Sequence, residues 1–195
     1  MFEALRATIQ AIFRESARVR DAFLAQGIDT LIEIVNQMVE VIRRGDKVLL
    51  FGNGGSAADA QHIAAEFVNR YQIERMPLPA LALTTDTSIL TAIGNDYDFN
   101  NIFSKQIKAL GRQGDAAIGI STSGNSKNVN NGLELAREIG LITIGLGGSP
   151  DSVMRDYCDY YLAVYGSATP RIQETHSIIG HTIVEMLDMK LFGSV

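Results

Sequence analysis

The chain has 195 residues, of which 46% are hydrophobic and 20% charged, enough for one domain with a substantial buried core. Seventeen basic residues against twenty-two acidic ones give a formal net charge of −5, which argues against the broad basic surface that binds nucleic acid or anionic lipid. The single cysteine, Cys158, excludes an intramolecular disulfide framework and a cysteine-rich zinc module, and is typical of a reducing compartment.

The start of the chain has the features of neither a signal peptide nor a membrane span. Glu3 and Arg6 interrupt its apolar residues, and no apolar stretch elsewhere approaches the roughly 18 residues that a membrane helix requires. No repeat, low-complexity tract or Pro/Ser-rich linker divides the sequence. We therefore expect a soluble, cytoplasmic protein with residues 1–195 in one domain and with neither a membrane nor a nucleic-acid partner.

Residues 2–43 carry apolar side chains at helical spacing in two sets, separated by Gly27 and Asp29. This pattern predicts a helical hairpin over residues 1–43. A doubly wound sheet can begin directly with a strand, so more than forty residues of helix in front of it need an explanation. An oligomer interface and a cover for one face of the sheet account for them equally well.

Short apolar runs that end in turn residues alternate with helical patterns through the rest of the chain. The expected strands are residues 48–51, 78–83, 116–120, 141–146 and 160–164, and the expected helices are 57–70, 89–92, 102–110, 128–139 and 172–192. This alternation predicts an α/β fold with a three-layer, doubly wound, mainly parallel five-stranded sheet. Ligands bind such sheets at the carboxyl ends of the strands, so a functional site is expected there.

The first of two candidate binding loops, residues 52–56, reads Gly-Asn-Gly-Gly-Ser between a strand and a helix. Glycines let the backbone approach a ligand closely, and a helix N-terminus offers free N–H groups. Read as G-x-G-x-x-A, the loop also matches the dinucleotide fingerprint, with Asp86 as the acidic partner of a ribose. A nicotinamide enzyme is therefore one alternative.

The second loop, residues 121–126, reads Ser-Thr-Ser-Gly-Asn-Ser before the helix at 128–139. Its four hydroxyls and its backbone N–H groups suit a phosphate, and it lacks the lysine of a nucleoside-triphosphate loop. Serine and asparagine also favour helix N-caps, but one cap does not require four hydroxyls. Two such loops at adjacent strand ends suit a phosphorylated polyol better than a dinucleotide.

The three histidines lie on two predicted helices. His62 and Glu66, four residues apart after the first loop, can converge on one ion or one substrate. On the last helix His176 belongs to the apolar stripe and is expected in the core, whereas His181 lies on the polar face. From periodicity alone, a solvated His–Glu pair and an exposed His181 are the simpler interpretations.

Several motifs, taken in chain order, resemble those of the phosphoheptose isomerases, which are SIS-domain proteins. The stretch 51–66 with Asn69-Arg70-Tyr71 resembles the first site of that family, and the match continues through residues 93–96, 100–104, 119–126 and 171–176 and covers nearly the whole chain. The resemblance implies a cytoplasmic homotetramer with one zinc per subunit. It also implies conversion of D-sedoheptulose 7-phosphate into D-glycero-D-manno-heptose 7-phosphate, which feeds lipopolysaccharide or related glycans.

The resemblance further implies the roles of individual residues. Substrate contacts carry over to Asn53, Gly54, Gly55, Glu66, Asn95, Asp96, Ser121, Thr122, Ser123, Ser126 and Gln173, and zinc ligands to His62, Glu66, Gln173 and His181. Such an isomerase passes a proton from C1 to C2 through an enediol, with Glu66 as the base and His181 as the acid/base on oxygen. A zinc-bound carboxylate is a weaker base than a free one, so the two roles of Glu66 conflict.

Two details of the last helix bear on this resemblance. Gln173 and His181 would lie about 12 Å apart on one continuous helix, too far for a single ion. We therefore expect the helix to begin after Gln173 or the metal site to be shared between subunits. Thr169 and Pro170 precede Arg171, where some relatives carry an acidic residue, so a proton relay through that acid is in doubt.

A non-catalytic SIS protein is the main alternative to an isomerase. Such a protein would bind a replication initiator or sense a sugar phosphate, and the two loops alone would serve it. The replication-initiator-binding relatives, however, lack the equivalent of Glu66 and much of the metal set, whereas this chain retains all four ligand types.

Overall fold

A computed structural model describes residues 1–193, so the last two residues of the predicted domain 1–195 lie outside it. In this part of the chain five strands form one parallel sheet in the order β2-β1-β3-β4-β5. The strands are β1 (Val48–Gly52), β2 (Ala80–Ala82), β3 (Ala116–Ser121), β4 (Ile142–Gly147) and β5 (Tyr160–Ala163). The predicted parallel five-stranded fold is confirmed, although β2 is only half as long as expected.

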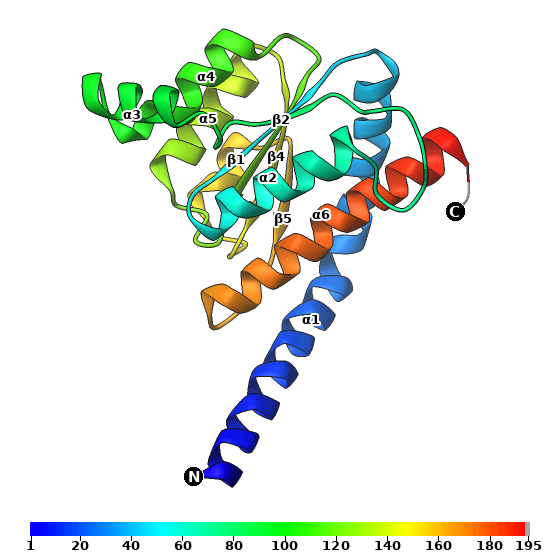
Figure 1. Ribbon diagram of the computed structural model, residues 1–195, viewed down its shortest axis with the longest axis vertical. Coiled ribbons are helices and arrows are strands. Elements are labelled where there is room, and N and C mark those ends of the chain that lie inside the picture. The colour runs from blue at the N-terminus through cyan, green and yellow to red at the C-terminus, as the bar shows by residue number, and fades with distance from the viewer. Residues whose placement is uncertain (194–195) are drawn as a thin grey trace.

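Helices cover both faces of this sheet and make three layers (Figure 1). They are α1 (Phe2–Arg43), α2 (Gly55–Val68), α3 (Thr87–Asp96), α4 (Ile102–Leu110), α5 (Lys127–Glu138) and α6 (Thr169–Phe192), with short 3-10 helices η1 (Phe99–Asn101) and η2 (Val153–Tyr157). Val48 and Leu50 of β1 face the core formed with α1, α2 and α6, and Leu49 and Phe51 face the core formed with α4 and α5. All of β1 is therefore buried, as expected for a strand covered on both faces.

The predicted helical hairpin over residues 1–43 is wrong, because α1 is one helix. Gly27 lies inside it, where the missing side chain leaves room for the ring of Phe23, and Asp29 is exposed. An interior glycine costs a helix only about 1 kcal/mol, which packing against the domain can offset. Turn-forming residues in the sequence were therefore a misleading sign of a break.

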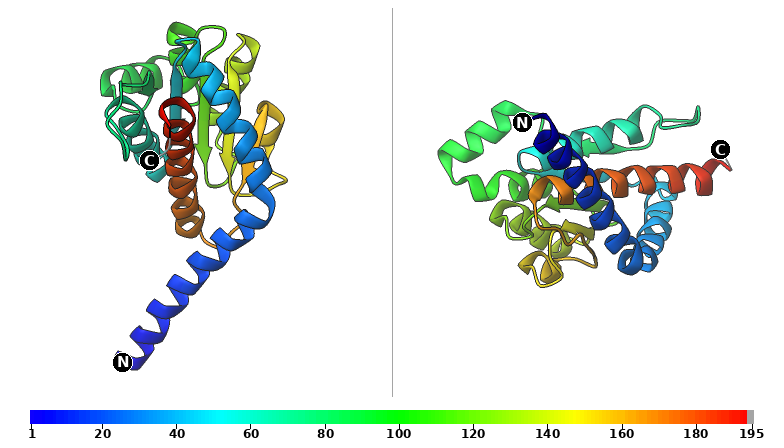
Figure 2. Two further views of the ribbon diagram at one scale, coloured as in Figure 1. Left: turned by 90° about the vertical axis from the view of Figure 1, so that its right-hand side faces the viewer. Right: turned by 90° about the horizontal axis from the view of Figure 1, so that it is seen from below.

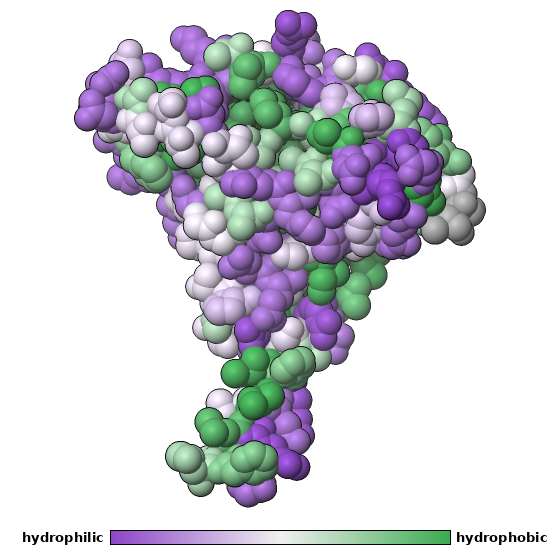
Figure 3. All heavy atoms as spheres, viewed as in Figure 1, coloured by the Kyte–Doolittle hydropathy of each residue, from purple (hydrophilic) through white to green (hydrophobic). Residues whose placement is uncertain are grey.

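The two ends of α1 have different surroundings. From Val19 onward the helix packs on one face of the sheet, whereas residues 2–14 are exposed and project from the molecule (Figure 2). The projecting part presents its apolar side chains on one side (Figure 3). The C-terminal part of α1 thus covers the sheet, whereas the N-terminal part projects from it, with a hydrogen bond from Nη1 of Arg171 to the carbonyl of Ile12 at 3.4 Å near its root.

The strand order reverses between β1 and β3. Chain connections run from β1 outward to β2 on one side and from β3 outward to β4 on the other, with Gly52 of β1 opposite Ile120 of β3. Ligands of doubly wound sheets bind at this reversal, outside the carboxyl ends of the strands. The fold therefore places the two predicted binding loops side by side. Among the described residues, no helix is both long and apolar enough to cross a membrane.

Candidate active site

The first loop, residues 52–56, turns on a glycine. Gly54 has a φ of +55°, a conformation that glycine adopts far more readily than other residues. The N–H groups of Ser56 and Ala57 donate to the carbonyls of Asn53 and Gly54, at 3.0 and 3.1 Å. This tight turn brings the N-terminus of α2 to the end of β1.

Ser121 is the centre of the second loop. Its hydroxyl lies 3.0 Å from that of Ser126 and 3.3 Å from that of Ser123, and it accepts a hydrogen bond from the N–H of Gly124 at 3.1 Å. Gly124 has a φ of +65°, and a side chain there would collide with Ser152. Three of the four predicted hydroxyls, those of Ser121, Ser123 and Ser126, are therefore neighbours, and Thr122 lies between them in the chain.

An asparagine pair joins the two loops. The side-chain amide of Asn53 donates to Oδ1 of Asn128 at 2.8 Å, and that of Asn128 donates to Oδ1 of Asn53 at 2.9 Å. Asn128 is buried in the first turn of α5. Sequence reasoning missed Asn128, because nothing in its local pattern distinguishes it from other helix residues.

Helices α2 and α6 run side by side and contact one another turn by turn (Figure 1). The backbone of Gly55 lies against the side chain of Gln173. One turn further along both helices, Asp59 accepts a hydrogen bond from the Ser177 hydroxyl at 2.7 Å. By helical periodicity Asp59 falls on the same face of α2 as His62 and Glu66. It is buried because α6 covers that face, which no local pattern reveals.

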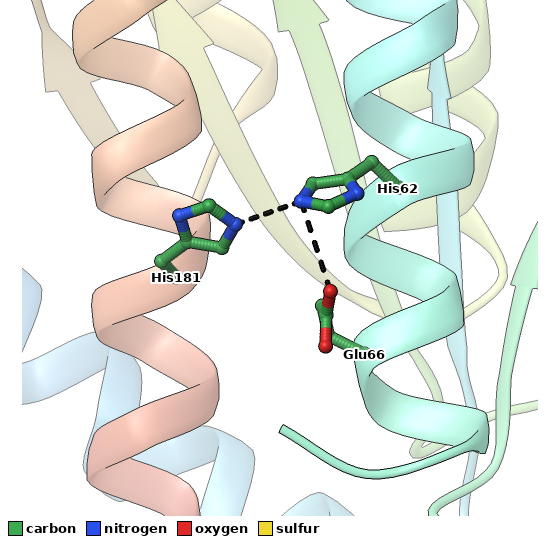
Figure 4. Close-up of side chains that lie close together, drawn as sticks. All are labelled: His62, Glu66 and His181. Atoms are coloured by element: carbon green, nitrogen blue, oxygen red, sulfur yellow. Dashed lines mark hydrogen bonds and ion pairs between the residues drawn. The ribbon is translucent and has the colours of Figure 1, made fainter. Parts of the chain in front are cut away.

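The next turn of both helices brings His62 and His181 together. Their Nε2 atoms lie 2.8 Å apart, and Oε1 of Glu66 lies 3.7 Å from Nε2 of His62 (Figure 4). The ring of Tyr71 stacks on that of His181, with 5.5 Å between centroids. The side chains of His62 and Glu66 are 51% and 23% exposed, so a substrate can reach them. We refer to His62, Glu66 and His181 as the His–Glu cluster.

The His–Glu cluster fits a zinc ion. Its three side chains offer two nitrogens and a carboxylate oxygen, all within 4.8 Å of one another. Tetrahedral zinc separates such ligand atoms by roughly 3.3 Å, so the two imidazoles would move apart by only about half an ångström. Two imidazoles and a carboxylate are also a ligand set that zinc takes in proteins.

Gln173 lies away from the His–Glu cluster in its own chain. Helix α6 begins at Thr169, with Pro170 in its first turn, so the expectation that it begins after Gln173 is wrong. Proline has no N–H to donate and is favoured at that position. The Gln173 side chain lies against Gly55, about 10 Å along α2 from His62. One chain therefore brings together three of the four predicted metal ligands.

Asn95 and Asp96 end helix α3. Both are exposed, and the amide of Asn95 donates to Oδ1 of Asp96 at 2.8 Å. Helix α3 and the glycine loop border a cavity of 140 Å³, lined by Asn53, Leu90 and Phe99 among others. Asn95 and Asp96 therefore lie on the helix that borders this cavity together with the glycine loop.

Asp86, the candidate ribose ligand, caps helix α3. Its Oδ1 accepts a hydrogen bond from the N–H of Ile89 at 2.9 Å. N-capping is a common role of aspartate, so this residue has an explanation without a dinucleotide.

His176 is fully buried on the opposite side of α6 from His181, as predicted. Its Nε2 lies 3.2 Å from the carbonyl of Gly147, to which it can donate. Burial disfavours the charged imidazolium and lowers the pKa of His176 to about 4. This histidine is therefore neutral at physiological pH.

Comparison with known proteins agrees with this geometry. The SIS domain family matches residues 12–148. The phosphoheptose isomerase of Nitratidesulfovibrio vulgaris is 52% identical over 181 residues, which are 93% of this chain and 87% of that protein. The structure of a phosphoheptose isomerase from Neisseria gonorrhoeae superposes with a TM-score of 0.89 at 42% identity, covering 94% of this chain and 98% of the other. A phosphoheptose isomerase structure from Francisella tularensis superposes with a TM-score of 0.90 at 33% identity, covering 94% and 97%. The chain is therefore a SIS-domain protein that belongs to the phosphoheptose isomerase family.

Proposed function

We propose that this protein converts D-sedoheptulose 7-phosphate into D-glycero-D-manno-heptose 7-phosphate. The observation that carries the proposal is the course of helix α2. It begins at the glycine loop, beside the hydroxyls of the second loop, and two turns later carries His62 and Glu66 to His181. One bound sugar phosphate can therefore reach both the loops and the titratable side chains. The relatives named above are phosphoheptose isomerases, which supports this assignment.

In the proposed complex the two loops hold the substrate. The phosphate is bound by the hydroxyls and backbone N–H groups of the second loop, which sit at the N-terminus of α5. The sugar hydroxyls are bound by the remaining residues carried over from the family. The phosphate ligands are Ser121, Thr122, Ser123 and Ser126, and the sugar ligands are Asn53, Gly54, Gly55, Glu66, Asn95, Asp96 and Gln173. Such local dipoles explain how a protein of net charge −5 can hold a dianion.

In the proposed reaction Glu66 moves a proton between the two carbons of the substrate, and His181 moves protons at its two oxygens. Glu66 removes a proton from C1 while His181 donates one to the C2 carbonyl oxygen, which yields the enediol. Protonated Glu66 then returns its proton to C2, and His181 takes a proton from the C1 hydroxyl, which yields the aldose. Both residues finish in their starting protonation states.

We assign zinc to the His–Glu cluster, one ion per subunit, because its donor set fits that ion. When bound there, zinc would polarise the substrate carbonyl. As metal ligands, Glu66 is a weaker base than a free carboxylate and His181 has no proton to donate from the nitrogen that binds the ion, so a comparison of the metal-free and zinc-loaded enzyme tests which role each residue serves.

We propose that the fourth ligand, Gln173, comes from the partner subunit. Within one chain Gln173 lies with the glycine loop, and α6 is unbroken between Gln173 and His181. A site shared between subunits is the remaining way to bring Gln173 to the ion. This arrangement requires an oligomer.

The apolar surface of α1 supports the homotetramer that the family resemblance implies. The exposed apolar residues of its projecting part are Phe2, Leu5, Ile9, Ile12 and Phe13. A second apolar surface is the groove of 600 Å³ between α1 and α6, lined by Leu24, Ile28, Ile178 and Met189 among others. Large exposed apolar surfaces are uncommon on monomers and mark interaction sites. Deletion of residues 2–14 should therefore dissociate the oligomer, as measured by light scattering.

We place the activity in the cytoplasm, at the entry to heptose synthesis for lipopolysaccharide or related glycans, with residues 1–195 as one domain. The lone cysteine is compatible with a reducing compartment.

The deciding experiment assays the purified protein with a panel of phosphorylated ketoses, with and without a chelator. We expect turnover of sedoheptulose 7-phosphate that Glu66→Gln abolishes and that Glu134→Gln, an exposed carboxylate on α5, leaves unchanged. Binding of the sugar phosphate without turnover, identical in wild type and Glu66→Gln, would instead identify a non-catalytic sugar-phosphate sensor.

A further inference from the structure

Glu66 occupies the last turn of α2, a position where helices open easily. The last four carbonyls of any helix have no partner within it, and terminal turns fray unless something caps them. Helix α2 has no basic residue in its last turn, and Asn69 rather than a glycine follows it. A side chain that must hold one geometry therefore stands on a turn without a cap of its own.

Arg75, from the loop that follows α2, supplies this cap. Its Nη2 donates to the carbonyl of Glu66 at 2.8 Å, and its Nη1 donates to the carbonyl of Phe67 at 2.7 Å, which also accepts from the N–H of Leu78 at 3.0 Å. Nη1 also donates to the carbonyl of Met76 at 3.2 Å. The guanidinium places a positive charge at the C-terminal, negative end of the helix dipole.

The same guanidinium binds α6. Nε of Arg75 donates to Oδ1 of Asp188 at 2.7 Å, and both side chains are only 1% exposed. Asp188 lies seven residues after His181, which is about two turns along the same stripe of α6. Arg75 therefore joins the two helices that carry the His–Glu cluster, through one buried ion pair and two carbonyls.

We propose that Arg75 is a positioning residue that holds Glu66 and His181 in the geometry of the His–Glu cluster; the inference rests on the function proposed above. Its planar fork serves both helix ends at once. A lysine would keep the charge at Asp188 but cannot donate to the two carbonyls and the carboxylate together. Loss of the fork leaves the carbonyl of Glu66 without this donor and the carbonyl of Phe67 with Leu78 alone, which loosens the last turn of α2 and with it the carboxylate of Glu66.

The test compares Arg75→Lys and Asp188→Asn with a matched control, Asp115→Asn, in the full-length protein. Asp115 is another buried carboxylate, paired with Lys47 where β1 and β3 begin, at the opposite edge of the sheet from the site. The first readout is hydrogen exchange of residues 66–69 without metal. The second is titration with Co²⁺, which reports affinity and, through its visible absorption, ligand geometry.

We expect Arg75→Lys to speed exchange of residues 66–69 at least tenfold, to weaken Co²⁺ binding at least tenfold and to alter its absorption. Asp188→Asn should act in the same direction and covers the case in which Arg75→Lys does not fold. Asp115→Asn should lower the melting temperature and leave both readouts unchanged. The proposal would be overturned if Arg75→Lys and Asp188→Asn both exchanged and bound Co²⁺ as the wild type does, or if Asp115→Asn showed the same changes as they do. If wild type itself binds no Co²⁺, the proposed metal site fails, and exchange alone decides the role of Arg75.

Discussion

The loop end and the helix end of the candidate site are built in different ways. At the loop end, hydroxyls and N–H groups converge within the six residues 121–126, and most of their bonds are local. At the helix end, His62 and His181 come from helices far apart in the chain and meet only because α2 and α6 pack in register. Binding an anion needs dipoles that a short segment can supply, whereas proton transfer needs titratable side chains that only long-range packing can pair.

The sharpest way to separate the two ends is to change the helix end. His181→Ala should lower kcat by roughly 10²- to 10⁴-fold and change KM little, because the proposed mechanism assigns to His181 the proton transfer at the substrate oxygens. Steady-state kinetics with sedoheptulose 7-phosphate measures both constants. A rise in KM with unchanged kcat would show that His181 binds the substrate and does not transfer a proton.

Acidification should lower stability through His176, which belongs to neither end. Its pKa is lowered by burial from 6.5 to about 4, so the folded state binds its proton less readily than the unfolded state. The stabilisation is complete above pH 6.5 and is lost as the pH falls toward 4, by on the order of 3 kcal/mol. Urea unfolding of wild type and His176→Gln at pH 7.5, 6 and 5 isolates this effect. Equal pH dependence in the two proteins would contradict it.

A smaller effect is expected at the loop end. Ser121→Ala should raise KM about tenfold with kcat nearly unchanged, because a hydrogen bond to the phosphate stabilises ground and transition states alike. Ser123→Ala should act in the same direction. If the serine variants instead lowered kcat with little change in KM, as expected for His181→Ala, the two ends would not differ in function.

The smallest effect is expected at Cys158, which lies beyond both ends, between η2 and β5. Burial raises the pKa of its thiol to about 12, and the thiol lies 3.2 Å from the carbonyl of Met154. Alkylation should be slow in the native protein and fast in urea, and Cys158→Ala should leave kcat and KM unchanged. Rapid alkylation of Cys158 in the native protein, with loss of activity, would show that a change in this region alters the site.

Local chemistry in the sequence was enough for much of the fold and for half of the site. Apolar runs that end in turn residues located all five strands, and the strand-loop-helix order placed residues 52–56 and 121–126 at carboxyl ends. The apolar spacing of the last helix placed His176 in the core. These features depend on periodicity and turn preference, which neighbouring residues carry.

Only the tertiary structure decided how the helices meet. Packing against the domain keeps α1 continuous through Gly27, and the cover of α6 buries Asp59. The contact of His62 with His181 and the ion pair of Arg75 with Asp188 join segments more than a hundred residues apart. Such contacts depend on the register and crossing of whole helices, and no local pattern encodes them. The sequence by itself therefore determined where the two loops lie, and packing determined which titratable side chains meet beside them.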